Sequence, residues 1–315
     1  MPFITTDIAH CASRLAQGQL VAIPTETVYG LAADARNPAA VQRVFDLKGR
    51  PSTNPLIVHL HDMNHVDEWA SQVPDAAQRL MHACWPGPLT LVLPARASVS
   101  RSVTAGQDSV ALRVPAHPVA LALLKAFAGG LVAPSANRYM SISPTTASHV
   151  AQQFARSDLH ILDGGPCQVG LESTIVSLLP GEAPRLLREG MLGVGDLEQI
   201  LGCELLIGSP GNLRVPGQHL RHYAPGTPAS GFKQLNRDAL NNPLHGWLWC
   251  EKPVPSAGPA IELGDDPQQY AAGLYAALYK LDGLGLNHLH IQLPPPGPAW
   301  AAIHDRLARA CHSEV

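Results

Sequence analysis

Residues 20–30 read LVAIPTETVYG, an apolar run that Pro24 closes and a polar loop follows. Four consecutive apolar residues that end at a proline are typical of a short buried strand. The loop carries the side chains of Thr25, Glu26 and Thr27. Because ligands of α/β proteins bind in the loops at strand ends, this stretch predicts a strand of such a sheet and a candidate site directly after it.

The same alternation of strands and helices continues on both sides of this loop. Asp7 is a capping residue for a helix that Gly18 stops, and Asn37 followed by Pro38 is typical of the start of a helix that breaks at Gly49. Further helices are expected at 75–85 and 119–127 and from near Ser143-Pro144, and strands at 56–60, 89–93, 110–114, 131–133, 160–162 and 173–179. The sequence therefore predicts a mixed α/β (α+β) domain over residues 1–207.

A second, smaller unit follows a change in composition. Residues 208–232 are rich in glycine, proline and basic or aromatic side chains and lack apolar periodicity, so we expect a linker that acts as a lid. Beyond it the pattern restarts, with strands expected at 244–249 and 288–293 and helices at 268–284 and 299–310. This predicts a small Rossmann-like α/β domain over residues 233–315.

The composition excludes several classes of protein. The 315 residues are 46% hydrophobic and 15% charged, so a helical bundle or coiled coil is not expected. The net charge of −3 provides no global positive field for nucleic acid. The apolar runs are too short to span a membrane, no basic segment precedes an apolar run at the start, and the six cysteines are widely scattered. We therefore expect a cytoplasmic protein without disulfides or structural zinc.

The few cations beside strand ends are candidates for binding an anion. Residues 48–55 read KGRPSTNP, in which Lys48 and Arg50 flank a glycine and hydroxyl and amide groups follow. This group suits a polyphosphate, although cations also favour the dipole of a merely solvated helix end. Arg113 stands in the otherwise apolar segment 109–114, where it must face solvent or find an anionic partner. The residues alone leave these alternatives open.

Three more segments place polar groups at strand ends, APSAN at 133–137, LESTIV at 171–176 and LREG at 187–190.

The sequence contains no Walker-type phosphate loop, no G-x-S-x-G elbow and no H-E-x-x-H. His59, His61 and His65 lack a nearby carboxylate–cysteine cluster, so we expect surface or substrate-contact roles for them rather than metal ligation. No metal held by the protein is therefore expected.

Taken together, these segments resemble a known family. Seven segments occur in the order that is typical of YrdC-like domains. They are PTETVYGLAADA at 24–35, KGRPSTNPLIVHL at 48–60, PGPLTLVLP at 86–94, SVALRVPAHP at 109–118, APSANR at 133–138, SPTTASHV at 143–150 and GLESTIVSL at 170–178. PGQHLRHYAPGTP at 216–228 is similar to the linker of the two-domain threonylcarbamoyl-AMP synthases. In that family the linker joins a YrdC-like catalytic domain, built on a twisted mixed sheet, to a small Rossmann-like domain. Tyr139-Met140 departs from the pattern, since a Ser-Gly pair is common there, and the tail is short for the family.

The resemblance implies an L-threonylcarbamoyladenylate synthase, a nucleotidyltransferase that condenses L-threonine, bicarbonate and ATP into threonylcarbamoyl-AMP and releases diphosphate. It implies Mg²⁺ that is bound mainly by ATP itself. The positions that match threonine-binding residues of the family are Thr27, His59, Arg113, Ala133 and Ser173. The positions that match ATP-binding residues are Lys48, Arg50, Asn54, Ser109, Ser135, Ser143, Arg188 and Tyr223. Lys48 and Arg50 are the catalytic candidates, because their charges would neutralise the phosphates.

The resemblance also implies partners. The product would pass to other proteins, which transfer the threonylcarbamoyl group to an adenosine beside the anticodon of tRNA. The slight acidity of the chain predicts that tRNA itself binds at most weakly, and no membrane partner is expected. One rival function is a non-catalytic RNA-binding module of the YrdC-like fold, which would bind tRNA in a salt-dependent way without turning over ATP. A carbamoyl transferase with another donor is disfavoured, because the acylphosphatase-like and zinc-finger segments that accompany it have no match here.

Overall fold

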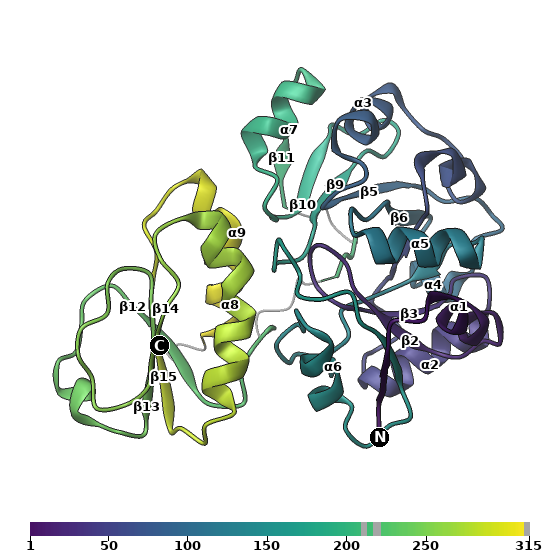
Figure 1. Cartoon of the computed structure of the whole chain (residues 1–315). Helices are drawn as coiled ribbons and strands as arrows, with labels where there is room; N and C mark the ends of the chain where they lie inside the picture. The colour runs from purple at the N-terminus through teal and green to yellow at the C-terminus, as the bar shows by residue number, and fades with distance from the viewer. Residues whose placement is uncertain (209–212, 217–221, 312–315) are drawn as a thin grey trace.

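The computed structural model describes residues 1–208, 213–216 and 222–311. Parts of the predicted linker at 208–232 therefore lie outside the described residues. The described chain forms an 11-stranded sheet in the order β1-β8-β2-β3-β7-β4-β6-β5-β9-β10-β11 and a four-stranded sheet in the order β12-β15-β13-β14. The two sheets lie in separate parts of the molecule (Figure 1). The larger sheet is mixed and the smaller one is parallel throughout, which confirms the predicted fold class.

The larger sheet and its helices occupy the first two thirds of the chain. Its strands are β1 (Phe3–Thr5), β2 (Val21–Ile23), β3 (Gly30–Asp34), β4 (Ile57–His59), β5 (Leu89–Pro94), β6 (Ser109–Arg113), β7 (Leu131–Val132), β8 (His160–Leu162), β9 (Thr174–Ser177), β10 (Arg185–Arg188) and β11 (Leu206–Ile207). The helices are α1 (Ile8–Ala16), α2 (Pro38–Lys48), α3 (Asp75–Cys84), α4 (Arg101–Thr104), α5 (Pro118–Phe127), α6 (Ala147–Gln153) and α7 (Val194–Leu201), with a 3₁₀ turn at Met63–Glu68.

The structure confirms the capping residues predicted for α1 and α2. The Asp7 side chain accepts from the backbone N–H of His10 and starts α1. Asn37 caps α2 by accepting from Ala39 and Ala40, and Gly49 ends that helix in the left-handed conformation with φ of 64°. The break at Gly49 turns the chain toward Arg50 and the segment before β4, and so positions part of the site.

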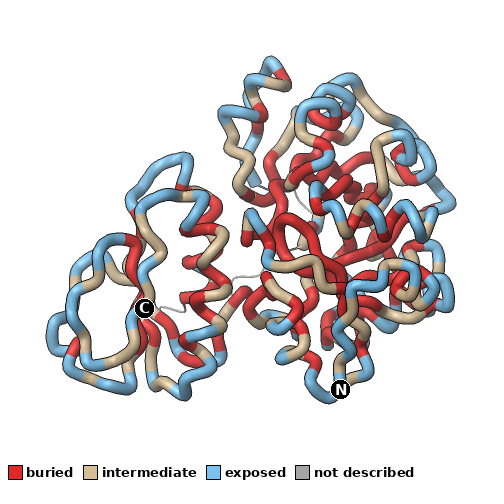
Figure 2. The backbone as a smooth tube through the Cα atoms, in the orientation of Figure 1, coloured by how far each residue is buried: buried red, intermediate tan, exposed pale blue. Residues whose placement is uncertain are grey.

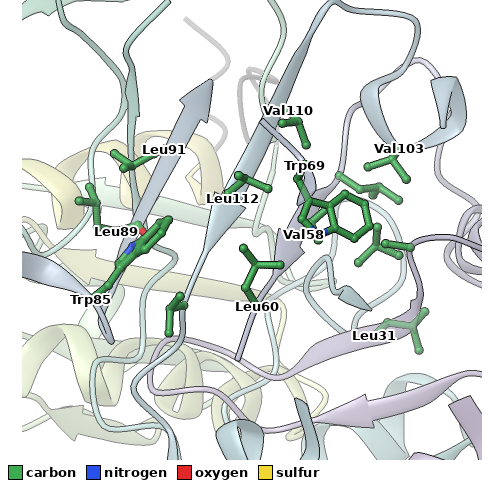
Figure 3. Close-up of a cluster of buried hydrophobic side chains, with 14 of the residues drawn as sticks. Leu31, Val58, Leu60, Trp69, Trp85, Leu89, Leu91, Val103, Val110 and Leu112 are labelled. Atoms are coloured by element: carbon green, nitrogen blue, oxygen red, sulfur yellow. The ribbon is translucent and has the colours of Figure 1, made fainter. Parts of the chain in front are cut away.

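The core of the first domain is an apolar cluster between the large sheet and its helices (Figure 3). Val58 of β4, Leu91 of β5 and Leu112 of β6 are fully buried neighbours in it, and Trp69 and Trp85 close it from two loops. Burying a side chain of this kind contributes about 1.5–3 kcal/mol. The three central strands are therefore held firmly, and their ends provide a rigid base for the loops that follow them.

The smaller sheet forms a second domain. Its strands are β12 (Ala229–Phe232), β13 (His245–Trp249), β14 (Ala260–Glu262) and β15 (His288–Gln292), its helices are α8 (Pro267–Asp282) and α9 (Ala301–Ala310), and short 3₁₀ turns lie at Asp238–Asn241 and Pro298–Trp300. Alternate residues of β15, Leu289 and Ile291, are fully buried against the helices. Both helices lie between this sheet and the first domain, where buried residues of the two domains meet (Figures 1 and 2).

Three expectations differ from the structure. The helix expected from near Ser143 begins at Ala147, because Thr146 caps it by accepting from the N–H of His149. Residues 229–232, which the sequence assigns to the linker, form β12 and pair with β15. The strand β3 was not expected, because GLAAD lacks the β-branched and aromatic residues that mark strands.

β3 makes the loop of 24–29 a hairpin connection. β2 and β3 pair in antiparallel register, with Ile23 opposite Gly30. A hydrogen bond within the loop stabilises the turn, since the Thr25 hydroxyl donates to the carbonyl of Val28 at 2.6 Å. Gly30 forms a bridge to Ser135, and a Cβ at Gly30 would lie 2.9 Å from the Cβ of Ala133. The glycine therefore allows the hairpin to approach the end of β7 closely.

All six cysteines are free thiols. None of the helices in the described ranges combines the length and the apolar character that a bilayer crossing requires. Other elements that the sequence did not predict are β1, β10, β11, β14, α4 and α7. Most of these are short, or lie at the edge of a sheet, where two to four residues carry little periodic signal.

Candidate active site

A pocket lies where the ends of several strands of the large sheet meet. It encloses about 520 Å³ of empty space, part of which is open to solvent. The residues that line it are Thr27, Val28, Arg50, Leu56, Ile57, His59, Arg113, Ala133, Pro134, Ser135, Glu172, Ser173, Arg188, Pro216, His222 and Tyr223. They come from the hairpin, the segment between α2 and β4, the strands β4, β6 and β10, the segments after β7 and before β9, and the linker. Strand-end loops thus converge on one site, as the sequence predicts.

Most of the sequence-predicted site residues line this pocket. All five threonine-side candidates do so: Thr27, His59, Arg113, Ala133 and Ser173. Four of the eight ATP-side candidates also do so: Arg50, Ser135, Arg188 and Tyr223. The structure thus brings these nine residues together, although their contacts with ligands remain predictions.

The other four ATP-side candidates are not part of the pocket lining. Lys48 donates through Nζ to the backbone carbonyls of Ser135 and Asn137, the latter at 2.7 Å. Asn54 donates to the Tyr139 hydroxyl at 3.4 Å. The two remaining candidates are buried: Ser109 starts β6, and Ser143 is bonded to Glu172. Lys48 and Ser143 therefore contact residues of the lining, Ser135 and Glu172, without forming the lining themselves.

Lys48 and Arg50 are not a solvated helix end. Both side chains are buried, which excludes the alternative that the sequence leaves open. Burial, with Arg50 nearby, lowers the pKa of Lys48 well below its usual range. Burial also lowers the pKa of Arg50 to about 10, so its guanidinium remains charged at neutral pH. Arg50 Nε has no hydrogen-bond partner among the described residues, a deficit that an anionic ligand would fill.

Arg113 has an anionic partner within the chain. Its Nη2 lies 2.6 Å from Oε1 of Glu26, and both side chains are almost fully buried. Its Nε donates to the carbonyl of Gly87 at 3.3 Å. The hairpin that carries Glu26 is therefore tied to the end of β6, and the Arg113 guanidinium is fixed at the pocket wall.

Arg188 is held by neighbours of the pocket. Its Nε donates to the Ser173 carbonyl and its Nη2 to the Ser173 hydroxyl, both at 3.0 Å, and its Nη1 donates to the carbonyl of Pro216 at 3.2 Å. Burial lowers its pKa. Arg50, Arg113 and Arg188 together bring three buried guanidinium groups to one pocket.

The His59 imidazole lies among the arginines of the pocket but carries no charge itself. It stands opposite Arg113 in the register of β4 and β6 and is 2% exposed. Burial, together with the charge of Arg113, lowers its pKa to about 3, so the imidazole is uncharged at physiological pH. His61 and His65 lie with Asp62 in a separate, half-exposed group outside the pocket lining, with possible ligand atoms within 4.8 Å of one another.

Two carboxylates at the site were not predicted from the sequence, Glu26 beside the pocket and Glu172 in its lining. Oε1 of Glu172 accepts from Ser143 at 2.6 Å, and its Oε2 accepts from Arg306 at 2.7 Å and from Tyr275 at 3.1 Å. Burial alone would raise the pKa of Glu172, but Arg306, Arg188 and Ser143 outweigh it and hold the pKa below its usual range. Both glutamates stand in strand-end segments, and that position was the only available signal.

The chain matches two family models. One, described as telomere recombination, matches residues 13–190, and the other, described as the C-terminal domain of threonylcarbamoyl-AMP synthase, matches residues 193–311. A threonylcarbamoyl-AMP synthase of Pyrococcus abyssi is 36% identical over 319 residues, which cover 96% of this chain and 93% of the relative. A threonylcarbamoyl-AMP synthase of Bacillus subtilis is 35% identical over 329 residues, which cover 98% and 94%.

Solved structures agree with these relatives. The crystal structure of P. abyssi Sua5 complexed with L-threonine has a TM-score of 0.89 at 33% identity, and the match covers 98% of this chain and 97% of that one. YciO of Escherichia coli has a TM-score of 0.53 at 20% identity and matches 62% of this chain, which shows a shared fold alone.

The fold and the pocket, together with these relatives, define a two-domain enzyme of the nucleotidyltransferase type. The chain belongs to the threonylcarbamoyl-AMP synthase family. The resemblance seen in the sequence is thereby confirmed, and the rival function of a non-catalytic RNA-binding module is not favoured.

Proposed function

We propose that this pocket condenses L-threonine, bicarbonate and ATP into threonylcarbamoyl-AMP and diphosphate. The observation that carries the proposal is the convergence of Arg50, Arg113 and Arg188 on one pocket, in a chain with only 15% charged residues. Glu26 already compensates Arg113, but Arg50 and Arg188 form no ion pair among the described residues, and buried cations are costly unless anions bind among them. A carboxylate and a polyphosphate together are ligands of the required charge.

Arg113 is proposed to bind the carboxylate of threonine. A guanidinium binds a carboxylate in a planar, two-bonded arrangement, and Glu26 holds this guanidinium in place from one side. His59 is neutral beside it, so it adds no competing charge and leaves a ring nitrogen without a partner among the described residues. Thr27 and Ser173 provide hydroxyls in the same lining. A relative solved in complex with L-threonine supports threonine as the ligand.

Arg50 and Arg188 are proposed to face the phosphates of ATP, with Ser135 and Tyr223 in the same pocket lining. Lys48 supports the segment that carries Ser135, because its Nζ donates to the backbone carbonyls of Ser135 and Asn137. Burial and the charge of Arg50 lower the pKa of Lys48, so we assign it this supporting contact and leave the phosphates to the two arginines.

The proposed reaction needs no nucleophile from the protein. The amine of threonine forms a bond to the carbon of bicarbonate, a C–O bond breaks and one water leaves, which gives a carbamate. A carbamate oxygen then attacks the α-phosphorus of ATP. The new bond joins that oxygen to the α-phosphorus, and the bond to the leaving diphosphate breaks. The protein's part is to hold the two anions close together and to neutralise the charge that develops on the phosphates.

Mg²⁺ is proposed to arrive with ATP as a substrate complex. Glu172 is the only carboxylate among the described residues of the lining, and both of its oxygens already accept hydrogen bonds. The pocket therefore fits a metal that is bound mainly by the phosphates rather than by the protein.

We further propose that the product passes to other cytoplasmic proteins for transfer to tRNA, with tRNA itself bound at most weakly by this chain.

Mass spectrometry tests the proposed function directly. Purified full-length protein incubated with Mg²⁺, ATP, L-threonine and bicarbonate is expected to form threonylcarbamoyl-AMP, together with one diphosphate per product. Omitting L-threonine or bicarbonate should abolish both signals. Diphosphate release that is independent of threonine, or tight salt-sensitive tRNA binding without any product, would contradict the proposal.

A further inference from the structure

The second domain contacts the segment that forms one wall of the pocket. Helices α8 and α9 lie between the small sheet and the first domain (Figure 1). From these helices Tyr275 and Arg306 donate to Glu172, and Tyr279 donates to the carbonyl of Ile142 at 2.8 Å. Arg306 is 1% exposed and also donates to the carbonyl of Glu189 at 2.9 Å, beside Arg188. The contact between the domains therefore lies directly behind the proposed nucleotide site.

Arg306 compensates a charge that would otherwise disturb this site. Glu172 is a buried carboxylate, and Arg306 and Arg188 are the two cations that act on its pKa. Only Arg306 forms an ion pair with it, at 2.7 Å. Arg188 forms no ion pair among the described residues and donates instead to Ser173 and Pro216. The charge of Arg188 is therefore left for a ligand of the pocket.

Arg306 also lies against the linker. Its Cζ is 5.2 Å from the centre of the Tyr223 ring, a cation–π distance, and the ring of Tyr275 lies 5.9 Å from Tyr223 on centroids. Tyr223 is buried and has a φ of 60°, in the left-handed region that residues with a Cβ rarely adopt. Such a conformation persists only where neighbours hold it, and Arg306 and Tyr275 are two of these neighbours.

We propose that Arg306 is a positioning residue for nucleotide binding. It neutralises Glu172, so that Arg188 stays available for the phosphates, and it holds Tyr223 at the pocket. This inference rests on the proposed function, which places Arg188 and Tyr223 on the ATP side. It gives the second domain a direct part in the nucleotide site.

The experiment uses four variants of the full chain. Arg306→Met removes the charge at similar length, and Arg306→Lys keeps it. The double variant Glu172→Gln with Arg306→Met removes both charges and leaves no buried ion unpaired. Arg36→Met is the matched control, because Arg36 also pairs with a glutamate, Glu68, and lies over a ring, Trp69, at 5.7 Å, but is half exposed.

Each variant is titrated with Mg²⁺-ATP by calorimetry, its melting temperature is recorded, and KM for ATP and for threonine are measured separately. Arg306→Met is expected to weaken ATP binding at least tenfold and to raise KM for threonine less than threefold. Arg306→Lys is expected to lie between it and the unmodified chain. The double variant is expected to recover most of the ATP affinity, because Arg188 no longer faces an unpaired carboxylate. Arg36→Met is expected to bind ATP like the unmodified chain.

Two results would overturn the proposal. One is an Arg306→Met variant that melts like the unmodified chain and binds ATP with unchanged affinity. The other is a double variant that is unfolded or binds ATP no better than Arg306→Met, since the defect would then not come from the charge of Glu172. If Arg306→Met alone fails to fold, the ATP affinity of the double variant still tests the proposal. An unmodified chain that binds ATP but forms no threonylcarbamoyl-AMP would contradict the proposed function instead, while the titrations still test Arg306.

Discussion

Glu26 and Arg113 form a buried ion pair that joins the β2–β3 hairpin to the end of β6. Their closest atoms, Oε1 and Nη2, lie 2.6 Å apart, and the side chains are 5% and 4% exposed. Oε2 of Glu26 is buried without a hydrogen-bond partner among the described residues. The pair therefore fixes a cation at the pocket wall at a cost in desolvation, which indicates a role in binding rather than in stability alone.

Replacing Arg113 by alanine should have two separable effects. It leaves Glu26 buried and unpaired, which should destabilise the fold by about 3–5 kcal/mol in denaturant unfolding. It should also abolish L-threonine binding in calorimetry. The double variant Glu26→Gln with Arg113→Met should recover most of the stability but not the threonine affinity. Recovery of both would show that Arg113 acts only on the fold.

Replacing Arg50 by alanine should abolish the diphosphate release that depends on threonine and bicarbonate, with a rate loss of at least about 100-fold. The reason is that a charge aimed at the phosphates is removed while the α2 helix and its Gly49 end are left intact. A coupled diphosphate assay measures the effect, with Arg36→Ala as a half-exposed control. Turnover near that of the unmodified chain would remove Arg50 from the mechanism.

His59 should make stability fall toward acid pH. Its pKa in the folded protein is lowered from 6.5 to about 3, so as pH falls below 6.5 the unfolded chain takes up the proton first. The associated stability is fully present above pH 6.5 and is lost progressively as pH falls toward 3. His59→Asn should reduce the slope of unfolding free energy between pH 6 and 4 by about 1.4 kcal/mol per pH unit.

Urea unfolding at a series of pH values measures this slope. His149, whose pKa burial lowers to about 4, provides a second histidine with the same sign, and it lies on α6 instead of in the pocket lining. The effects of His59→Asn and His149→Asn on the slope should therefore add. An unchanged slope in His59→Asn would show that His59 is protonated in the folded state.

Gly170→Ala should weaken the contact between the domains. Gly170 has a φ of +77°, and a Cβ there would lie 2.5 Å from the backbone oxygen of Ala271 in α8. The left-handed conformation costs a residue with a Cβ about 1–2 kcal/mol, and the clash should add about 1–3 kcal/mol. Gly181→Ala is the control, because its φ is +78° with open space around it. Equal melting temperatures of the two variants would mean that α8 moves away without cost.

The site was predictable from the sequence where local pattern and motif coincide. Strand-end loops with hydroxyl and cationic side chains indicated the segments, and the resemblance to the family assigned the nine residues that line one pocket, including Arg50 and Arg188. Lys48 and Ser143 were also predicted as site residues, but they do not line the pocket. A motif indicates that a residue belongs to a site, but not which way its side chain points. Lys48 turns to the carbonyls of Ser135 and Asn137, and Ser143 turns to Glu172.

The sequence by itself determined the α/β class, the presence of a second α/β unit after the linker and the family, because these depend on periodicity and on motifs that are read locally. It did not determine where that unit begins, since β12 lies within the predicted linker. Only the tertiary structure decided which charges meet. Glu26 pairs with Arg113 across 87 residues, and Glu172 pairs with Arg306 across 134 residues and between two domains. A buried ion pair is specified by which chain segments pack together, and no local pattern encodes that. The second domain's contact with the pocket therefore became visible only in the folded chain.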